Sequence, residues 1–338
     1  MHVYGDTVSD RAVSNFSKYI NDIKTLNPEH LIVWSDTEYE VDSIFENFFL
    51  QIDPWLKANN KHILVIAPGF DRKVSDNISI EGGHGYYLVN MQILFDHPNE
   101  NFDQVHLRSD KLFTLYCNRG SVERIQMIDT VVRENLLPSG IVTFKSAYFG
   151  EEMHVWKYHD GSRLYDEDEY DATNPKYSPN YFPKSFFRGF IDIVCESRVV
   201  DKQYFLTEKT AKSIVAQKPF LALSCQHYYQ YLKDDYGIEP YDEIFDYSFD
   251  SKPNVEDRIE GIVENIIRVK DLDKNHLHSL ILPKLQSNKA KFINYQYDIN
   301  KMFPKSLRFL AEGDYTIIGD DINSFSLWKE LVSKNGWL

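Results

Sequence analysis

The stretch FIDIVCESRVVDKQYFLTEKTAKSIVAQKPFLALS, residues 190–224, decides the fold of this chain. It opens with a short apolar run rich in branched residues and closes with a second apolar run after a Lys-Pro break. Between the two runs, a helical pattern starts near Thr207. Short apolar runs that alternate with helical segments are typical of parallel α/β structure, so we expect a strand, a helix and a strand here.

The same alternation continues on both sides of this stretch. Apolar runs of strand length precede it, and the segment after residue 120 has apolar residues at helical spacing with Ser121 as its expected N-cap. The further strands that we expect are residues 30–35, 61–69, 111–117 and 140–144. The further helices that we expect are residues 121–137, 228–237, 255–270 and 324–338.

A change of character between residues 158 and 185 marks an expected domain boundary. This segment is acidic, rich in Tyr and broken by Pro, and it has little periodicity. We therefore expect an α/β protein with two Rossmann-like domains, residues 1–180 and 181–315, that face each other across a cleft. Residues 316–338 are expected to form a C-terminal helix that packs back on the first domain. In such sheets, ligands bind at the carboxyl ends of the strands.

The composition limits the classes of function. The chain has 338 residues with 37 Lys and Arg against 51 Asp and Glu, a formal net charge of −14. This charge gives no global attraction to nucleic acid or to anionic membranes, although a local basic patch remains possible. No apolar run has the length of a membrane span or the form of a signal peptide, so we expect a cytoplasmic protein. The three cysteines are expected to be reduced and buried near strand ends: Cys117, Cys195 and Cys225.

The Thr-Glu-Lys segment at residues 207–209 places a positively charged side chain at the expected start of a helix. Thr207 suits an N-cap, and Glu208 is favourable near the positive end of a helix dipole. Lys209 is mildly unfavourable there unless an anion lies beside it. One interpretation is a capped surface helix with an incidental ion pair. The other is a nucleotide site, in which the carboxylate binds a ribose diol while the lysine and the helix-start amides bind a diphosphate.

Three motifs carry a resemblance to a known group of enzymes. They are Phe205 to Thr210 (FLTEKT), Lys218-Pro219-Phe220, and Asp246 to Asp250 (DYSFD), and the segment YCNRGSVER at residues 116–124 adds a fourth. Residues 111–270 resemble the nucleotide-sugar-binding part of fucosyltransferases of GT-B fold, and more closely the glycosyltransferases of large bacteriophages. The fucosyltransferases have Phe-Glu-Asn where this chain has Cys195-Glu196-Ser197, which leaves the identity of the sugar open.

The resemblance implies a hexosyl- or pentosyltransferase that moves a sugar from a nucleotide-diphosphate donor to a hydroxyl without a metal or another cofactor. Residues 1–180 would bind the acceptor, and residues 181–315 would bind the nucleotide sugar. Glu208 would hold the ribose and Lys209 the phosphates or the sugar, with Glu196 facing the sugar or its ribose. For Arg124, a surface salt bridge on its helix is an equal alternative. The donor-binding residues implied are Asn118, Arg119, Arg124, Glu196, Arg198, Thr207, Glu208 and Lys209.

The catalytic base is not singled out by the sequence. His84 lies in the glycine-rich run EGGHGYY, residues 81–87, which is either a surface turn or the place of a general base. Asp71 follows an expected strand and is an equal candidate. The acidic run DEDEYD, residues 166–171, is expected to be a solvated loop and not a metal site. Asp246 and Asp250 suit a turn as well as a site.

Two kinds of acceptor fit the resemblance. One is a glycan or lipopolysaccharide, and the other is a hydroxymethylated pyrimidine in bacteriophage DNA, with the host cytoplasm as the location if the chain is encoded by a phage. The alternative from another class is a non-catalytic protein that binds a nucleotide or a carbohydrate and has kept the fold. The sequence contains no Walker loop and no Rossmann glycine fingerprint, which weakens ATPase and dehydrogenase interpretations.

Overall fold

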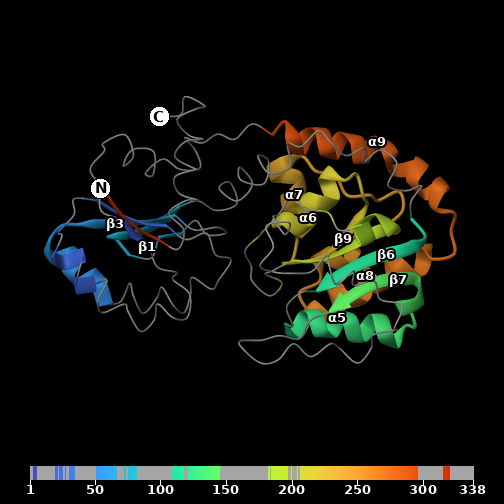
Figure 1. Cartoon of the computed structure of the whole chain (residues 1–338), viewed down its shortest axis with the longest axis horizontal. Helices are drawn as coiled ribbons and strands as arrows, with labels where there is room; N and C mark the ends of the chain where they lie inside the picture. The colour runs from blue at the N-terminus through green and yellow to red at the C-terminus, as the bar shows by residue number, and fades with distance from the viewer. Residues whose placement is uncertain are drawn as a thin grey trace. The chain divides into compact units, whose positions relative to one another are not determined.

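The computed structural model divides the chain into two compact units, residues 1–90 with 296–338, and residues 91–295 (Figure 1). The residues that the structure describes are 3–5, 20–21, 23–25, 27, 30–34, 51–66, 72–73, 75–81, 109–117, 121–144, 182, 184–196, 199, 204, 206–295 and 315–319.

The unit of residues 91–295 is built on a parallel sheet with the strand order β7-β6-β8-β9. Its strands are β6 (Lys111–Cys117), β7 (Gly140–Phe144), β8 (Gly189–Cys195) and β9 (Phe220–Leu223). Every residue of β8 and β9 is buried, as expected for parallel strands with both faces covered. The expected strands at 111–117, 140–144, 190–197 and 219–224 are therefore confirmed within a residue or two.

Helices cover both faces of this sheet and make it Rossmann-like. They are α5 (Val122–Arg133), α6 (Glu208–Val215), α7 (Tyr228–Tyr236), α8 (Val255–Val269) and α9 (Lys274–Ile293). Short 3-10 helices lie at Leu137–Ser139, Lys184–Arg188 and Ser248–Ser251. Helix α5 packs with α8, and α6 packs with α9. In Figure 1, α5 and α9 lie on opposite sides of the sheet.

The order of the strands creates a switch point between β6 and β8. The connection through α5 leads from β6 to β7 on one side, whereas the connection through α6 leads from β8 to β9 on the other. Because crossover connections between parallel strands are right-handed, the two helices must lie on opposite faces. The segments after β6 and β8 therefore diverge at the carboxyl edge of the sheet, which is where open α/β sheets bind ligands.

The pairing of β6 with β8 in one sheet differs from the domain division that we expected from the sequence. A boundary at residue 180 separates β6 and β7 from β8, but Phe113 and Ile191 are register partners in one sheet. The segment that indicated the boundary, residues 158–185, lies almost wholly outside the described residues. Its acidic composition is compatible with a long excursion between β7 and β8 of a single sheet, and composition alone does not distinguish the two.

Residues 1–90 and 296–338 contribute a second sheet, with the order β1-β10-β2-β3-β5-β4. Its strands are β1 (Val3–Gly5), β2 (His30–Trp34), β3 (His62–Ile66), β4 (Arg72–Lys73), β5 (Ile78–Glu81) and β10 (Tyr315–Gly319). All pairs are parallel except β4 with β5. The expected helix at 316–338 is wrong at its start, because residues 316–319 pair between β1 and β2. Its remainder lies outside the described residues.

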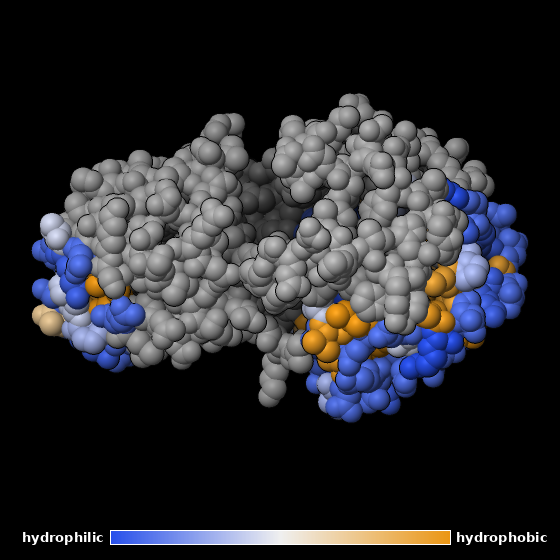
Figure 2. Space-filling view, turned by 60° about the horizontal axis from the view of Figure 1, so that its bottom comes forward, coloured by the Kyte–Doolittle hydropathy of each residue, from blue (hydrophilic) through white to orange (hydrophobic). Residues whose placement is uncertain are grey.

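Helix α9 is one of the elements that the sequence pattern did not indicate. It contains Pro283, and its exposed Leu280 and Ile293 interrupt any single apolar stripe. Its buried side chains are Leu277, His278, Ile281, Leu285, Asn288 and Phe292. On the face shown in Figure 2, the described surface of this unit is mainly hydrophilic with some apolar areas. The exposed large apolar side chains among its described residues come from several different elements.

A buried polar network crosses the middle of the sheet. Asp192 of β8 accepts hydrogen bonds of 2.6 Å from both Thr114 of β6 and Ser213 of α6. The Lys218 ammonium donates to Thr114 Oγ1 and to the Phe186 carbonyl, both at 2.6 Å, and lies 4.1 Å from the Phe186 ring centroid. Lys218 has no exposed surface, and burial lowers its pKa to about 8 in spite of the nearby Asp192.

We predict that the buried lysine makes stability rise with pH. Between pH 8 and 10.5 the unfolded chain holds a proton on Lys218 that the folded protein has released, so the free energy of unfolding increases with pH in that window. Relative to Lys218→Met, the wild type should gain on the order of 3 kcal/mol from pH 8 to pH 10.5. Urea unfolding of both proteins at several pH values measures this difference. A difference that does not change with pH would contradict the assignment.

Candidate functional site

The candidate site lies at the carboxyl edge of the sheet, at the switch point between β6 and β8. Strand β6 ends at Cys117 and β8 ends at Cys195. Of the residues that follow these strands, Asn118, Arg119 and Arg198 lie outside the described residues, whereas Glu196 is described. The proposed bases His84 and Asp71 lie outside the described residues too, so their roles stay predictions.

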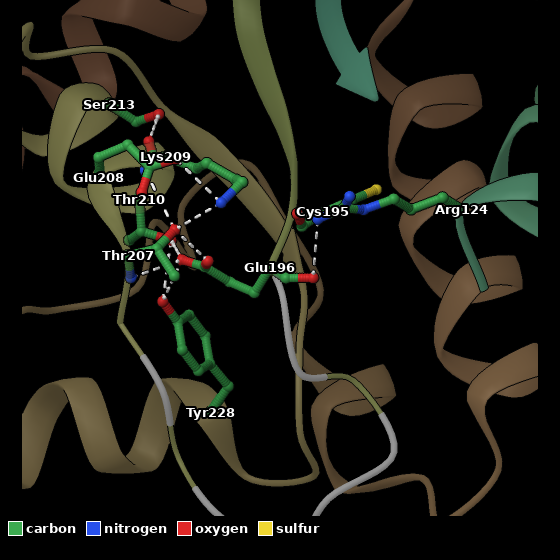
Figure 3. Close-up of polar contacts among 9 residues, drawn as sticks. All are labelled: Arg124, Cys195, Glu196, Thr207, Glu208, Lys209, Thr210, Ser213 and Tyr228. Carbon is green, nitrogen blue, oxygen red and sulfur yellow. Dashed lines mark hydrogen bonds and ion pairs between the residues drawn. The ribbon is translucent and has the colours of Figure 1, made fainter. Parts of the chain in front are cut away.

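The Thr-Glu-Lys segment begins α6 at this edge (Figure 3). Thr207 is the N-cap, as expected, and its hydroxyl accepts a hydrogen bond of 3.3 Å from the Lys209 backbone N–H. The Lys209 ammonium lies 3.0 Å from Glu208 Oε1 and donates to Thr207 Oγ1 at 3.1 Å. The side chains of Glu208 and Lys209 are 23% and 27% exposed, so solvent reaches both charges of the pair.

Glu196 has contacts that differ from those implied by the resemblance. Its carboxylate is buried and accepts hydrogen bonds from the Thr207 backbone N–H and hydroxyl, from the Thr210 hydroxyl at 2.6 Å, and from the Tyr228 hydroxyl at 3.1 Å. Burial raises its pKa, against the opposing effects of Lys209 and of the threonine hydroxyls. The carboxylate therefore faces the first turn of α6, and its contact with the donor sugar or its ribose stays a prediction.

This arrangement accounts for the lysine at the start of a helix. The repulsion between the Lys209 ammonium and the positive end of the helix dipole is offset within the protein, because the Glu208 carboxylate pairs directly with this ammonium. The Glu196 carboxylate adds a second negative charge one hydroxyl away, through Thr207. A bound anion is thus not required for Lys209 to be stable at this position, although the partly exposed pair can exchange its partners for those of a ligand.

Arg124 is buried at the strand end beside the proposed site, and its contact with the donor stays a prediction. It is only 7% exposed, so it is not part of a surface salt bridge on its helix. Its guanidinium reaches from α5 to the end of β8, where Nη2 donates to the carbonyls of Cys195 at 3.2 Å and Glu196 at 3.5 Å (Figure 3). Arg124 therefore ties α5 to the strand end at the switch point, in line with a positive charge beside the proposed site.

The aspartates after α7 have contacts typical of turns. Asp250 accepts a hydrogen bond of 3.1 Å from the Tyr229 backbone N–H near the start of α7, and burial raises its pKa to about 6. Asp246 accepts one of 2.9 Å from the Ser248 backbone N–H. These bonds favour the structural alternative for both residues.

The three cysteines of the chain are all among the described residues. Cys117, Cys195 and Cys225 are free and buried, which confirms the expectation. In the described part of the chain, no group of three or more His, Cys, Asp or Glu side chains could hold a metal ion, and the acidic run at 166–171 lies outside it. Among the same residues, no helix is long and apolar enough to cross a membrane.

Three residues around the site were not singled out from the sequence: Thr210, Ser213 and Tyr228. The spacing of Thr207, Thr210 and Ser213 places three hydroxyls on one face of α6, and this signal was present in the sequence. Polar residues on the face that meets a sheet call for buried partners. Tyr228 had no such signal, because its contact with Glu196 bridges 32 residues.

Comparison with known proteins adds no identification. The chain matches no protein-family model, no curated protein and no solved structure.

We predict that Arg124 stabilises the fold through the two carbonyls at the end of β8. Arg124→Met should lower the free energy of unfolding by about 2 kcal/mol, because it removes charged hydrogen-bond donors from buried acceptors. Arg133→Met is the matched control on the same helix, since Arg133 is 59% exposed, and it should change stability by less than about 0.5 kcal/mol. Urea unfolding of the two variants tests this, and equal effects would contradict the buried role of Arg124.

Proposed function

We propose that this protein is a glycosyltransferase that moves a sugar from a nucleoside-diphosphate donor to a hydroxyl group. The observation that carries the proposal is the partly exposed Glu208–Lys209 pair on the first turn of α6, at the carboxyl edge beside the switch point of a Rossmann-like sheet. The resemblance of residues 111–270 to glycosyltransferases of GT-B fold points to the same edge.

The pair has the chemistry that a nucleotide diphosphate needs. A carboxylate such as Glu208 accepts two hydrogen bonds from the ribose diol. The Lys209 ammonium and the amides at the helix start suit the diphosphate, because a helix N-terminus carries partial positive charge. On binding, the ammonium exchanges Glu208 Oε1, now at 3.0 Å, for a phosphate oxygen.

The proposed reaction is a displacement at the anomeric carbon of the sugar. The acceptor oxygen forms a bond to this carbon while the bond to the diphosphate oxygen breaks, and the nucleoside diphosphate leaves with the bonding electrons. A base in residues 1–180, with His84 and Asp71 as candidates, takes the acceptor proton. Lys209, together with the arginines at 119 and 198, stabilises the negative charge that grows on the leaving group.

The full proposal includes the architecture and the acceptor. Two Rossmann-like domains would enclose the donor, in a protein that acts in the cytoplasm on either a glycan or hydroxymethylated DNA. A gel shift with modified duplex DNA at low salt separates the acceptors, because a glycan-modifying enzyme produces no shift.

We predict that donor binding depends on both members of the pair. Calorimetric titration of a panel of nucleoside-diphosphate sugars should identify one donor for the wild type. Glu208→Ala and Lys209→Met should each weaken its binding about tenfold or more, since each removes a charged contact to the ligand.

The control is Lys291→Met, which breaks a comparable ion pair with Glu239 elsewhere in the same unit and should leave binding unchanged. Wild-type affinity in the variants of both Glu208 and Lys209 would overturn the site, and a wild type that binds no donor of the panel would overturn the function. Binding without transfer of the sugar would instead support a non-catalytic nucleotide- or carbohydrate-binding protein that has kept the fold.

A further inference from the structure

Helix α6 is attached to β8 by a row of hydroxyl-to-carboxylate hydrogen bonds. Thr207 and Thr210 donate to Glu196, and one turn later Ser213 donates to Asp192 at 2.6 Å. Asp192 lies in β8 and Glu196 directly follows its last residue, so the two acids are four residues apart and lie on the same face of the extended chain. A helix of eight residues is too short to be stable by itself, and its placement therefore depends on these contacts and on packing.

We infer that Glu196 is a positioning residue, whose carboxylate fixes the first turn of α6 and thereby the place of the Glu208–Lys209 pair. The consequence for ligand binding rests on the proposed function, whereas the effect on the helix does not. Glu196 acts through Thr207, because its carboxylate oxygens accept hydrogen bonds from Thr207, Thr210 and Tyr228.

The hydrogen bonds of the Thr207 hydroxyl are fully assigned. A hydroxyl has one hydrogen and two lone pairs. Both lone pairs are used by Lys209, one by its backbone N–H at 3.3 Å and one by its ammonium at 3.1 Å. The single hydrogen must therefore point at Glu196 Oε2. Lys209, Thr207 and Glu196 form a chain of hydrogen bonds with one direction: the partly exposed ammonium donates to the hydroxyl, and the hydroxyl donates to the buried acid.

At the Glu196 end of this chain of hydrogen bonds, only a carboxylate provides the acceptor oxygens that the neighbouring donors require. Oε1 of Glu196 faces the Thr207 backbone N–H and the hydroxyls of Thr210 and Tyr228, while Oε2 faces the Thr207 hydroxyl. Every neighbour is a donor, although Tyr228 shares its one hydrogen with Thr210 Oγ1 at 2.8 Å. A glutamine would place its NH₂ group against donors in either orientation. Glu196→Gln thus preserves shape and removes the function of the side chain.

A general stabilising role would look different from a positioning role. Loss of stability alone affects the whole unit, whereas loss of positioning affects the first turn of α6 more than its last turn. The Lys209 amide is bonded to Thr207 Oγ1, and the Ala216 amide is bonded to the Lys212 carbonyl at the other end of the helix. The ratio of their hydrogen-exchange rates therefore reports the first turn specifically.

The test compares four variants by amide hydrogen exchange and by calorimetry with uridine diphosphate and guanosine diphosphate, each alone. Glu196→Gln replaces the final acceptor of the chain of hydrogen bonds, and Thr207→Val removes its middle member. Thr207→Ser restores the hydroxyl and serves as the conservative rescue. Ile266→Ala is the control, because Ile266 is fully buried in α8, on the face of the sheet opposite α6, and its loss lowers stability without touching α6.

We expect the Lys209-to-Ala216 exchange ratio to rise about tenfold in Glu196→Gln and Thr207→Val, the effect of one net hydrogen bond. Thr207→Ser and Ile266→Ala should keep the wild-type ratio. The affinity for the diphosphate that binds should fall about tenfold in the same two variants and recover in Thr207→Ser. If Glu196→Gln does not fold, the comparison of Thr207→Val with Thr207→Ser is sufficient to test the inference.

Two results would overturn the inference. One is an exchange ratio in Glu196→Gln or Thr207→Val that stays at the wild-type value. The other is a raised ratio with unchanged diphosphate affinity, which would make Glu196 merely structural. The proposed function is contradicted by a different result, namely a wild type that binds neither the diphosphates nor any nucleotide sugar. In that case the hydrogen-exchange measurement, which needs no ligand, still tests whether Glu196 fixes the first turn of α6.

Discussion

The attachment of helix α6 to strand β8 is the interaction on which the described site depends. The helix–sheet contact includes buried hydroxyls and carboxylates, which require partners because a buried charge without hydrogen bonds is very costly. Glu196 and Asp192 obtain these partners from Thr207, Thr210 and Ser213 on one face of the helix. Hydrogen bonds have direction, so these contacts define how far the helix lies along the strand more sharply than apolar packing alone.

The network continues from the helix into the centre of the sheet. Asp192 also accepts from Thr114 of β6, and Thr114 in turn accepts from the buried ammonium of Lys218. The residues on both sides of the switch point are thereby connected through side chains as well as through the backbone. A buried network of this kind stabilises one arrangement when every member is satisfied, and it is costly when a single partner is removed.

The charges of the site are organised from the inside outwards. Glu196 is buried among hydroxyl groups and accepts a hydrogen bond from Thr207. The Thr207 hydroxyl accepts a hydrogen bond from the Lys209 ammonium, which lies beside Glu208 on a partly exposed side chain. Arg124 approaches from the other face of the sheet and binds the last carbonyls of β8. This arrangement holds a paired acid and base at the edge where parallel α/β sheets bind ligands, and a nucleoside diphosphate has the complementary groups for both.

The sequence by itself determined many of the local elements of residues 91–295. Short branched apolar runs require burial, which identified β6 to β9, and capping residues such as Ser121 and Thr207 marked the starts of α5 and α6. Only the tertiary structure decided which strands share a sheet, because hydrogen bonding between strands leaves no local pattern. Strand β6 pairs with β8 although 71 residues, among them α5 and β7, separate Cys117 from Gly189, which is far beyond any sequence period. The same reason explains Glu196. Its position after a strand suggested a ligand, but the hydroxyl of Tyr228 that helps to bury it arrives from a helix 32 residues later.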